Sequence, residues 1–199
     1  MTTALIVLAA GMGTRMNSDL PKVLHQVAGA PLLVHALKSA ADIAADRCIV
    51  VAGHGAEAVG KAAKSWDETI ELVLQPEQKG TAHAVDMARD ALAGFSGDAI
   101  VLYGDTPFIQ PETLAAMQAA RRQHDVVVLG FQAQDPGRYG RLVMAGDSLQ
   151  RIVEYKDATE AERAISLCNS GVIAADCTQL FDLISKISNA NASGEYYLT

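Results

Sequence analysis

The chain alternates between short apolar runs and longer stretches in which apolar residues recur at helical spacing. The apolar runs occupy residues 4–10, 48–52, 71–74, 99–103 and 126–129. Most positions within each run are apolar, rather than every second one, which is typical of strands buried on both faces. Because strands that alternate with helices form βαβ units, the pattern predicts an α/β protein with a mostly parallel sheet and helices on both faces.

The same periodicity predicts individual helices. Apolar residues at helical spacing predict helices over residues 31–45, 81–92 and 177–187. A further helix is expected to begin near Pro111, since proline suits the first helical turn. A short charged helix over 157–165 and a strand over 167–174 complete the predicted elements.

The segment after Gln134 has a different pattern. Residues 140–155 alternate between apolar and polar positions around Gly146-Asp147, a dipeptide favoured in hairpin turns. We therefore expect a small β-rich flap near residues 134–156, attached to the main sheet.

Composition narrows the classes of function. Of 199 residues, 50% are hydrophobic and 20% are charged, which excludes an intrinsically disordered chain. The formal net charge of -7 argues against a surface that binds nucleic acid. The first apolar run ends in glycines and has no basic leader, which predicts neither a signal peptide nor a membrane span. The three cysteines have no CxxC spacing, so we expect a cytoplasmic protein without disulfides or a zinc site.

The loop after the first apolar run, LAAGMGTRMNSDLPK, carries the clearest chemical signal. Gly11 and Gly13 let backbone N–H groups approach phosphate oxygens, and Arg15 and Lys22 add two positive charges. The loop is not of the GxxxxGK[ST] type, and Met16 replaces the third glycine of GxGxxG. Two glycines alone would fit an ordinary strand-to-helix turn. Together with the two cations, they favour a phosphate-binding loop.

Two later loops add candidate side chains. Gln75 has one donor and one acceptor face that can match a pyrimidine edge, and Gly80 lets the chain pass close to a base. The alternative is that Gly80-Thr81 only caps a helix. Asp105 follows a strand and offers the oxygen donor that Mg²⁺ prefers beside phosphates, although an aspartate in a turn is more often a turn former. The five histidines show no metal-ligand spacing, and we expect them to be structural or exposed.

These motifs resemble those of the sugar nucleotidyltransferases, above all the uridylyltransferase domains of bacterial N-acetylglucosamine-1-phosphate uridyltransferases. The segments that match in the family's order are LAAGMGTRMNSDLPKVLH, LQPEQKGTAHAV, VLYGDTPFI, GRYGRLV, RIVEYKDAT, NSGV and GEYYLT. The resemblance implies a Rossmann-like nucleotidyltransferase domain over residues 1–199. We expect this domain to be C-terminally incomplete, with Tyr196 to Thr199 as the start of a family helix and a second metal ligand beyond it. The family's β-helix acetyltransferase domain is expected to be absent, because the sequence has no hexapeptide repeat.

The resemblance also implies roles for individual residues. The residues implied on the nucleotide are Leu8, Ala9, Ala10, Gly11, Gly13, Gln75, Gly80 and Thr81. The residues implied on the sugar are Tyr103, Gly140, Glu154 and Asn169, with Tyr139, Tyr197 and Thr199 as possible walls. Arg15 and Lys22 are implied as the catalytic cations on the phosphates, and Asp105 as the metal ligand. Each sugar-side residue could instead be an ordinary turn or surface residue. Only the resemblance favours a sugar-binding role for them.

The function implied is Mg²⁺-dependent transfer of a uridylyl group from UTP to N-acetylglucosamine 1-phosphate, giving UDP-N-acetylglucosamine and pyrophosphate. This reaction needs no general base because its nucleophile, a sugar phosphate, is already ionised near neutral pH. Two alternatives stay open: a relative that uses CTP or GTP, and a nucleotide-sugar-binding module without turnover. The expected partners are UTP and a sugar 1-phosphate, with neither a nucleic acid nor a membrane, and the sequence does not predict an oligomeric state.

Overall fold

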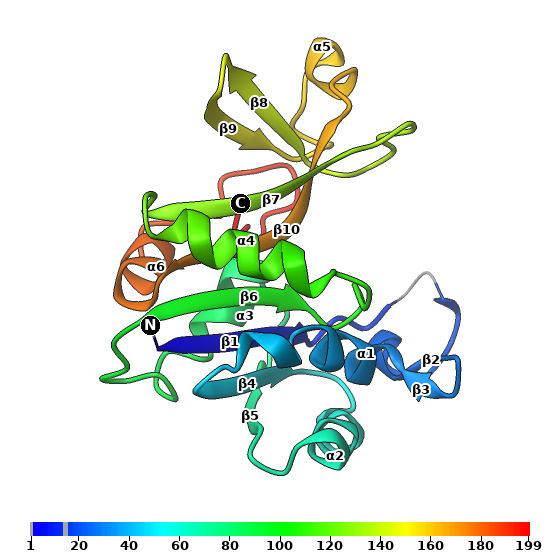
Figure 1. Ribbon diagram of the computed structural model, residues 1–199. Helices are drawn as coiled ribbons and strands as arrows, with labels where there is room; N and C mark the ends of the chain where they lie inside the picture. The colour runs from blue at the N-terminus through cyan, green and yellow to red at the C-terminus, as the bar shows by residue number, and fades with distance from the viewer. Residues whose placement is uncertain (1, 14–15) are drawn as a thin grey trace.

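The computed structural model describes residues 2–13 and 16–199, and within them eight strands form one mixed sheet (Figure 1). Its order is β5-β4-β1-β6-β10-β8-β9, with β7 paired to β10. The strands of this sheet are β1 (Thr3–Ala9), β4 (Arg47–Ala52), β5 (Glu71–Leu74), β6 (Asp98–Tyr103), β7 (Val126–Gln132), β8 (Arg141–Ala145), β9 (Ser148–Val153) and β10 (Leu167–Asp176). The helices are η2 (Lys22–Leu24), α1 (Leu32–Ser39), η3 (Ala41–Ile43), α2 (Ala56–Trp66), α3 (Thr81–Asp86), α4 (Pro111–Arg121), α5 (Glu160–Arg163) and α6 (Cys177–Ile184). A separate hairpin joins β2 (Gln26–Val27) and β3 (Ala30–Pro31).

The central part of the sheet is parallel, as the sequence predicts. Strand β1 pairs in parallel with β4 and β6, and β5 adds in parallel to the other edge of β4. All residues of β1 are buried. Leu5 and Val7 belong to the core cluster on one face, and Ile6 and Leu8 to the cluster on the other. The apolar run is therefore continuous because neither face of the strand meets water.

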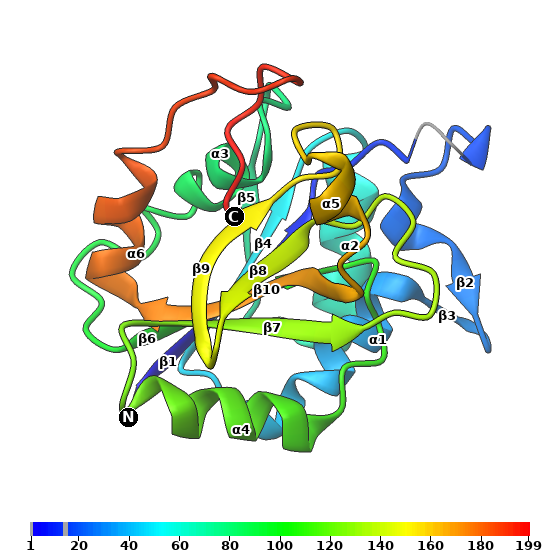
Figure 2. The ribbon, with the colours of Figure 1, turned by 90° about the horizontal axis from the view of Figure 1, so that it is seen from above.

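Helices cover both faces of this sheet (Figures 1 and 2). On one face, α1, α2 and α4 bury Leu33, Val59 and Leu114 in the first cluster. On the other face, α3 and α6 bury Val85 and Phe181 in the second cluster. In the part of the chain that the structure describes, no helix is long and apolar enough to cross a membrane.

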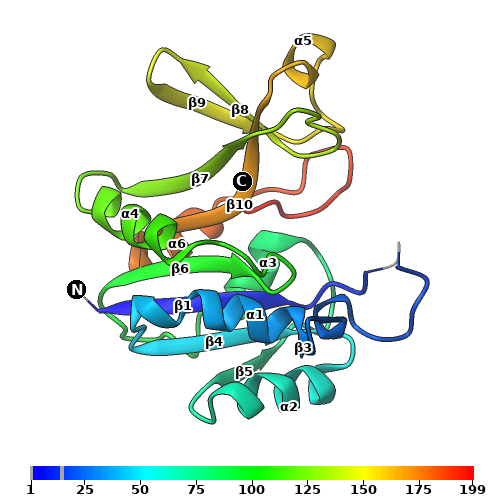
Figure 3. The ribbon, with the colours of Figure 1, turned by 45° about the vertical axis from the view of Figure 1, so that its right-hand side comes forward.

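The second half of the sheet is antiparallel and carries the predicted flap. Strand β10 runs antiparallel to β6 and β7, and Cys168 near its start pairs with Arg141 of β8. Between these pairings β10 shifts register beside Gly171, whose φ is +84°. The β8–β9 hairpin, which turns at Gly146 and Asp147, therefore stands above the parallel part on a bent strand (Figure 3).

Four predicted helices are shorter than expected. The helix predicted over 177–187 ends at Ile184, and the one predicted over 157–165 spans Glu160–Arg163. The helix predicted over 31–45 ends at Ser39, because the chain continues as a 3₁₀ turn and Ala44 adopts φ +49°. The helix predicted over 81–92 ends at Asp86, where i to i+3 hydrogen bonds take over. Ala88 and Leu92 remain buried in these turns, so the apolar spacing predicted their burial although the regular helix stops earlier.

Two other expectations need correction. Strand β5 is an edge strand in which Leu72 and Leu74 are exposed, so the run at 71–74 is not buried on both faces. The segment from Glu195 to Thr199 is not the start of a helix. It runs extended beside the first turn of α3 (Figure 2), where Tyr196 N donates to Lys79 O at 2.8 Å and its carbonyl accepts from Ala82 N at 2.9 Å. The Tyr196 carbonyl thus accepts from α3, whereas in a helix it would accept from a residue four positions later in its own segment.

Candidate active site

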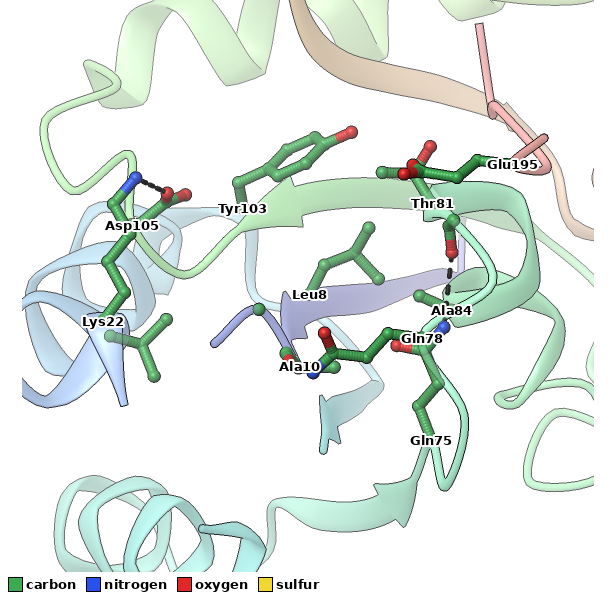
Figure 4. A pocket seen from close by; sticks show the side chains of 13 residues that line it. Leu8, Ala10, Lys22, Gln75, Gln78, Thr81, Ala84, Tyr103, Asp105 and Glu195 are labelled. Carbon is green, nitrogen blue, oxygen red and sulfur yellow. Dashed lines mark hydrogen bonds and ion pairs between the residues drawn. The ribbon is translucent and has the colours of Figure 1, made fainter. Parts of the chain in front are cut away.

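A cavity of about 250 Å³ lies at the carboxyl ends of β1, β5 and β6 (Figure 4). This edge is where ligands bind in open α/β sheets, because the loops that follow parallel strands converge there. The lining residues are Leu8, Ala10, Gly11, Lys22, Val23, Gln75, Gln78, Gly80, Thr81, Ala84, Tyr103, Asp105 and Glu195. The loops after β1, β5 and β6 are distant in sequence, and the fold brings them together around this cavity.

One end of this cavity is built from amide side chains. Gln75 is 4% exposed, and its Nε2 donates to the Gly80 carbonyl at 3.2 Å and lies 2.9 Å from His83 Nδ1. Gln78 Nε2 donates to the Ala10 carbonyl, which closes the loop after β5 over the end of β1 (Figure 4). The Gln75 amide is therefore held in a fixed orientation rather than free in a loop.

Two features of the structure require glycine at position 80: its backbone angles and the closeness of Tyr196. Its φ is +116° and its ψ is 178°, a region that only glycine adopts without strain. A Cβ at this position would also lie 2.7 Å from Tyr196 N. Thr81 follows as the first residue of α3, and its hydroxyl accepts from Leu198 N at 2.9 Å. These contacts tie the C-terminal segment to the wall of the cavity.

Lys22 and Asp105 form an ion pair inside the cavity (Figure 4). Lys22 comes from η2, and Asp105 from the turn after β6. Gly13 makes room for the lysine, since a Cβ there would lie 2.7 Å from Lys22 Cβ. The side chains are 43% and 24% exposed, so both charged groups can reach a ligand that enters the cleft.

A second cavity of about 550 Å³ continues from the first toward the flap. The two cavities share Lys22, Thr81, Tyr103, Asp105 and Glu195. The other residues that line the second cavity are Thr106, Arg138, Tyr139, Gly140, Glu154, Asn169, Ser170, Gly171, Tyr197 and Thr199. The ion pair of Lys22 and Asp105 therefore stands where the two spaces meet.

Polar groups of the second cavity are fixed by contacts with their neighbours. Asn169 Nδ2 donates to Thr199 Oγ1 at 3.1 Å, and its Oδ1 accepts from Gly171 N at 2.9 Å. Burial raises the pKa of the Glu154 carboxyl, the Asp157 charge raises it further, and the Thr199 hydroxyl opposes both. A Cβ on Gly140 would lie 2.8 Å from Glu154 Oε1, so glycine at this position leaves space for the carboxylate.

Tyr103 forms the wall between the two cavities. Burial raises the pKa of its phenol to about 12, against the smaller lowering by the Thr81 hydroxyl. A Cβ on Gly171 would lie 2.6 Å from the tyrosine ring. Tyr103 therefore stays a neutral hydrogen-bonding group near neutral pH.

The structure gathers most of the residues singled out from the sequence. All the sugar-side candidates line the second cavity, and among the nucleotide-side candidates Leu8, Ala10, Gly11, Gln75, Gly80 and Thr81 line the first. Ala9 does not line it, because its side chain belongs to the core cluster on the α1 face. Gly13 contacts Lys22 instead. Arg15 lies outside the described residues.

Some lining residues were missed in the sequence. These are Val23, Gln78, Ala84, Thr106, Arg138, Ser170, Gly171 and Glu195. Gln78 stands inside the motif LQPEQKGTAHAV, so the motif carried a signal for it. Glu195 carried none, because its place depends on the extended path of the C-terminal segment.

The fold and the cleft are those of a nucleotidyltransferase. Residues 5–171 match the MobA-like NTP transferase domain, and the chain belongs to this family. It is 65% identical over 199 residues to the bifunctional protein GlmU of Ruegeria pomeroyi and 64% identical over 198 residues to that of Cereibacter sphaeroides. Each match covers 100% of this chain and 44% of the relative, so the chain spans less than half the length of these relatives.

Solved structures share the fold at much lower identity. The crystal structure of UDP-glucose pyrophosphorylase complexed with UDP-glucose matches with a TM-score of 0.80 and 18% identity, over 100% of this chain and 84% of that chain. A putative glucose-1-phosphate thymidylyltransferase from Bacillus anthracis in complex with a sucrose matches with a TM-score of 0.78 and 19% identity, over 98% and 78%. The α/β architecture predicted from periodicity is thereby confirmed.

Proposed function

We propose that residues 1–199 form a nucleotidyltransferase domain that transfers a uridylyl group from UTP to N-acetylglucosamine 1-phosphate, with release of pyrophosphate. The observation that carries the proposal is that Lys22 and Asp105 lie where the two cavities meet. A nucleotide in the first cavity and a sugar phosphate in the second would bring their phosphates together at this point. The GlmU relatives, 65% and 64% identical over the whole chain, support the same assignment.

Uridylyl transfer depends mainly on the positioning of the two substrates and on positive charge near their phosphates. An oxygen of the sugar phosphate attacks the α-phosphorus of UTP, a new P–O bond forms, and the bond to the β-phosphate breaks to release pyrophosphate. Both reactants are anions, so the Lys22 ammonium serves by offsetting their repulsion and the charge that develops on the leaving group. The sugar phosphate is already ionised, so no side chain has to act as a general base.

The residues present fit a magnesium ion that arrives with the nucleotide. Among the described residues, His, Cys, Asp and Glu form no cluster of three that could hold a metal by themselves. Mg²⁺ commonly takes one or two carboxylates and completes its octahedron with phosphate oxygens and water, and Asp105 at the junction of the cavities offers one. Bound there, the ion would neutralise phosphate charge.

The sugar side is proposed from hydrogen-bonding capacity. Glu154 can accept from sugar hydroxyls, Asn169 can donate and accept, and Tyr103 supplies a phenol. Gly140 offers a close backbone approach beside the Glu154 carboxylate. A cavity of about 550 Å³ falls within the range of small-molecule sites.

A pyrophosphate-release screen tests the proposal. The protein is assayed with UTP, CTP, GTP and ATP, each combined with a panel of sugar 1-phosphates in the presence of Mg²⁺. We expect the highest kcat/KM with UTP and N-acetylglucosamine 1-phosphate. A higher value with CTP or GTP would reassign the substrate, and tight nucleotide-sugar binding without pyrophosphate release would indicate a binding module.

A further inference from the structure

His83 contacts the buried Gln75 amide, although sequence spacing gave this histidine no role. Gln75 begins the loop after β5, and His83 lies in α3. The Gln75 Nε2 atom is 2.9 Å from His83 Nδ1 and 3.2 Å from the Gly80 carbonyl oxygen. At 4% exposure, Gln75 has little water to replace either contact.

These two contacts account for both N–H groups of the amide. A primary amide has two N–H donors and one carbonyl acceptor. One N–H points to the Gly80 carbonyl, which can only accept. The other points to His83 Nδ1, which accepts when the neutral ring carries its proton on Nε2. The Gln75 Oε1 atom is then left for the cavity, and Figure 4 shows the Gln75 amide reaching the cavity wall beside Gln78 and Ala84.

We infer that His83 is a positioning residue that fixes Gln75 as a hydrogen-bond acceptor and so selects uracil over cytosine. The inference rests on the proposed function, since it takes the first cavity as the base site. Uracil carries a hydrogen on N3 and can donate to Gln75 Oε1. Cytosine has an unprotonated N3 that only accepts, so it would face the same oxygen with a lone pair. Leaving a buried polar pair unmatched costs about 1–3 kcal/mol, roughly tenfold to a hundredfold in affinity.

Two acceptors hold the amide orientation more firmly than one. If the amide rotated by 180°, Oε1 would face the Gly80 carbonyl, and it would also face the His83 Nδ1 lone pair while the ring proton is on Nε2. Without the acceptor at position 83, rotation loses only the bond to Gly80, and Nε2 becomes available to the N3 atom of cytosine. The histidine therefore affects which base is preferred, beyond any contribution to the stability of α3.

Substitutions at position 83 separate the effect of the Nδ1 hydrogen-bond acceptor from the effect of the size and shape of the side chain. His83→Phe keeps an aromatic ring and removes Nδ1, and His83→Leu does the same with a smaller side chain in case the phenyl ring disturbs folding. His83→Asn restores an acceptor, because its Oδ1 can lie close to the place of Nδ1. His124→Phe is the matched control, since His124 is exposed and lines neither cavity. Thermal unfolding checks each variant before use.

The readout is the ratio of the dissociation constants for CTP and UTP, measured by calorimetry with Mg²⁺, so that it does not depend on turnover. We expect a ratio of about tenfold or more for the unmodified chain and for His83→Asn and His124→Phe, and a clearly smaller ratio for His83→Phe and His83→Leu, in which only the Gly80 carbonyl still orients the amide. A folded Phe or Leu variant with an unchanged ratio would overturn the inference. So would a loss that Asn fails to restore, or equal binding of UTP and CTP by the unmodified chain.

Failure of the proposed function gives a different result. If the unmodified chain releases no pyrophosphate from any NTP, the transfer reaction is wrong. The binding ratio still decides the role of His83 in that case, because a preference for UTP that falls in the Phe variant and returns in the Asn variant supports the inference on its own.

Discussion

Lys22 is the residue at which the proposed action of charge on the phosphates can be tested apart from folding. Its ammonium pairs with Asp105 in a cleft and stays 43% exposed, so the pair contributes little to stability. We expect Lys22→Ala to lower kcat about a hundredfold, the typical loss when one preorganised charge contact to the transition state is removed. Pyrophosphate release at saturating substrates measures this loss, and thermal unfolding should show a nearly unchanged melting temperature.

Lys79→Ala is the control for this prediction. Lys79 pairs with Glu77 on the surface and lines neither cavity, so its removal should leave kcat unchanged. If both lysine variants kept the original kcat, the catalytic site would have to lie elsewhere.

At the scale of elements, the contact between α3 and the C-terminal segment joins the two cavities. Gly80 lines the first cavity, its neighbour Tyr196 lies against it, and Tyr197 lines the second. Gly80→Ala should destabilise the protein by about 1–3 kcal/mol, because alanine is strained at φ +116°. The displaced segment should also raise KM for both substrates. Chemical denaturation and initial-rate kinetics measure the two effects.

Gly94→Ala provides the comparison for Gly80→Ala. Gly94 also has a positive φ, +76°, but a Cβ there would meet nothing within 4 Å. The Gly94→Ala substitution should therefore lower the stability through backbone strain and leave both KM values unchanged. Equal kinetic effects in the two variants would contradict the role given to the Gly80–Tyr196 contact.

A second element-scale prediction concerns the attachment of the flap. Arg141 is 1% exposed, and its guanidinium donates to the carbonyls of Gly137, Tyr139 and Arg163. Arg141→Met would leave these acceptors unpaired, at about 1–3 kcal/mol for each buried group that finds no water. We expect a loss of at least about 2 kcal/mol in the free energy of unfolding. We also expect a higher KM for the sugar phosphate, because Tyr139 lines the second cavity, which is the proposed sugar site.

Arg122→Met tests whether any lost arginine has this effect. Arg122 lies at the exposed end of α4, so both its stability and its KM values should match those of the unmodified chain. An Arg141→Met variant as stable as Arg122→Met would show that the flap is held by other contacts.

At the scale of the whole molecule, Glu154 links global stability to pH. Its pKa is raised mainly by burial. A carboxyl with a raised pKa in the folded state favours folding while it is protonated, and this contribution is lost as pH rises through the folded-state pKa. Glu154→Gln should therefore be more stable than the unmodified chain at neutral pH, with a difference that shrinks in acid. Melting temperatures across pH measure the difference.

Glu162 should show the opposite dependence. Hydrogen bonds from Thr159, with a further contribution from Arg151, lower its pKa to about 2, so its contribution to stability is present above the ordinary carboxyl pKa and is lost as pH falls toward 2. Glu68→Gln, at an exposed loop position, should change neither profile. A Glu154→Gln variant less stable at neutral pH would contradict the assignment of burial as the main cause.

Local sequence patterns predicted those strands, turns and helix starts that depend mainly on one short-range effect. The buried run of β1, the hairpin around Gly146 and the start of α4 at Pro111 follow from burial on both faces, turn preference and helix entry, each set by a few neighbouring residues. The motif resemblance placed Gln75 and Asp105 among the candidates, and both line the cleft. Their roles in binding and catalysis stay predictions.

The sequence by itself determined the order along the chain of the strands in the main sheet, most of the helices, the α/β class and most of the residues that surround the cleft, but its periodicity did not predict α2 (Ala56–Trp66). Only the tertiary structure decided that Leu74 lies at an exposed sheet edge, that Glu195 to Thr199 runs extended beside α3, and that Ala9 faces the core. It also decided that His83 meets the Gln75 amide. Periodicity and turn chemistry act between near neighbours in sequence, whereas edges, partner strands and amide orientation depend on which distant segments the fold brings into contact.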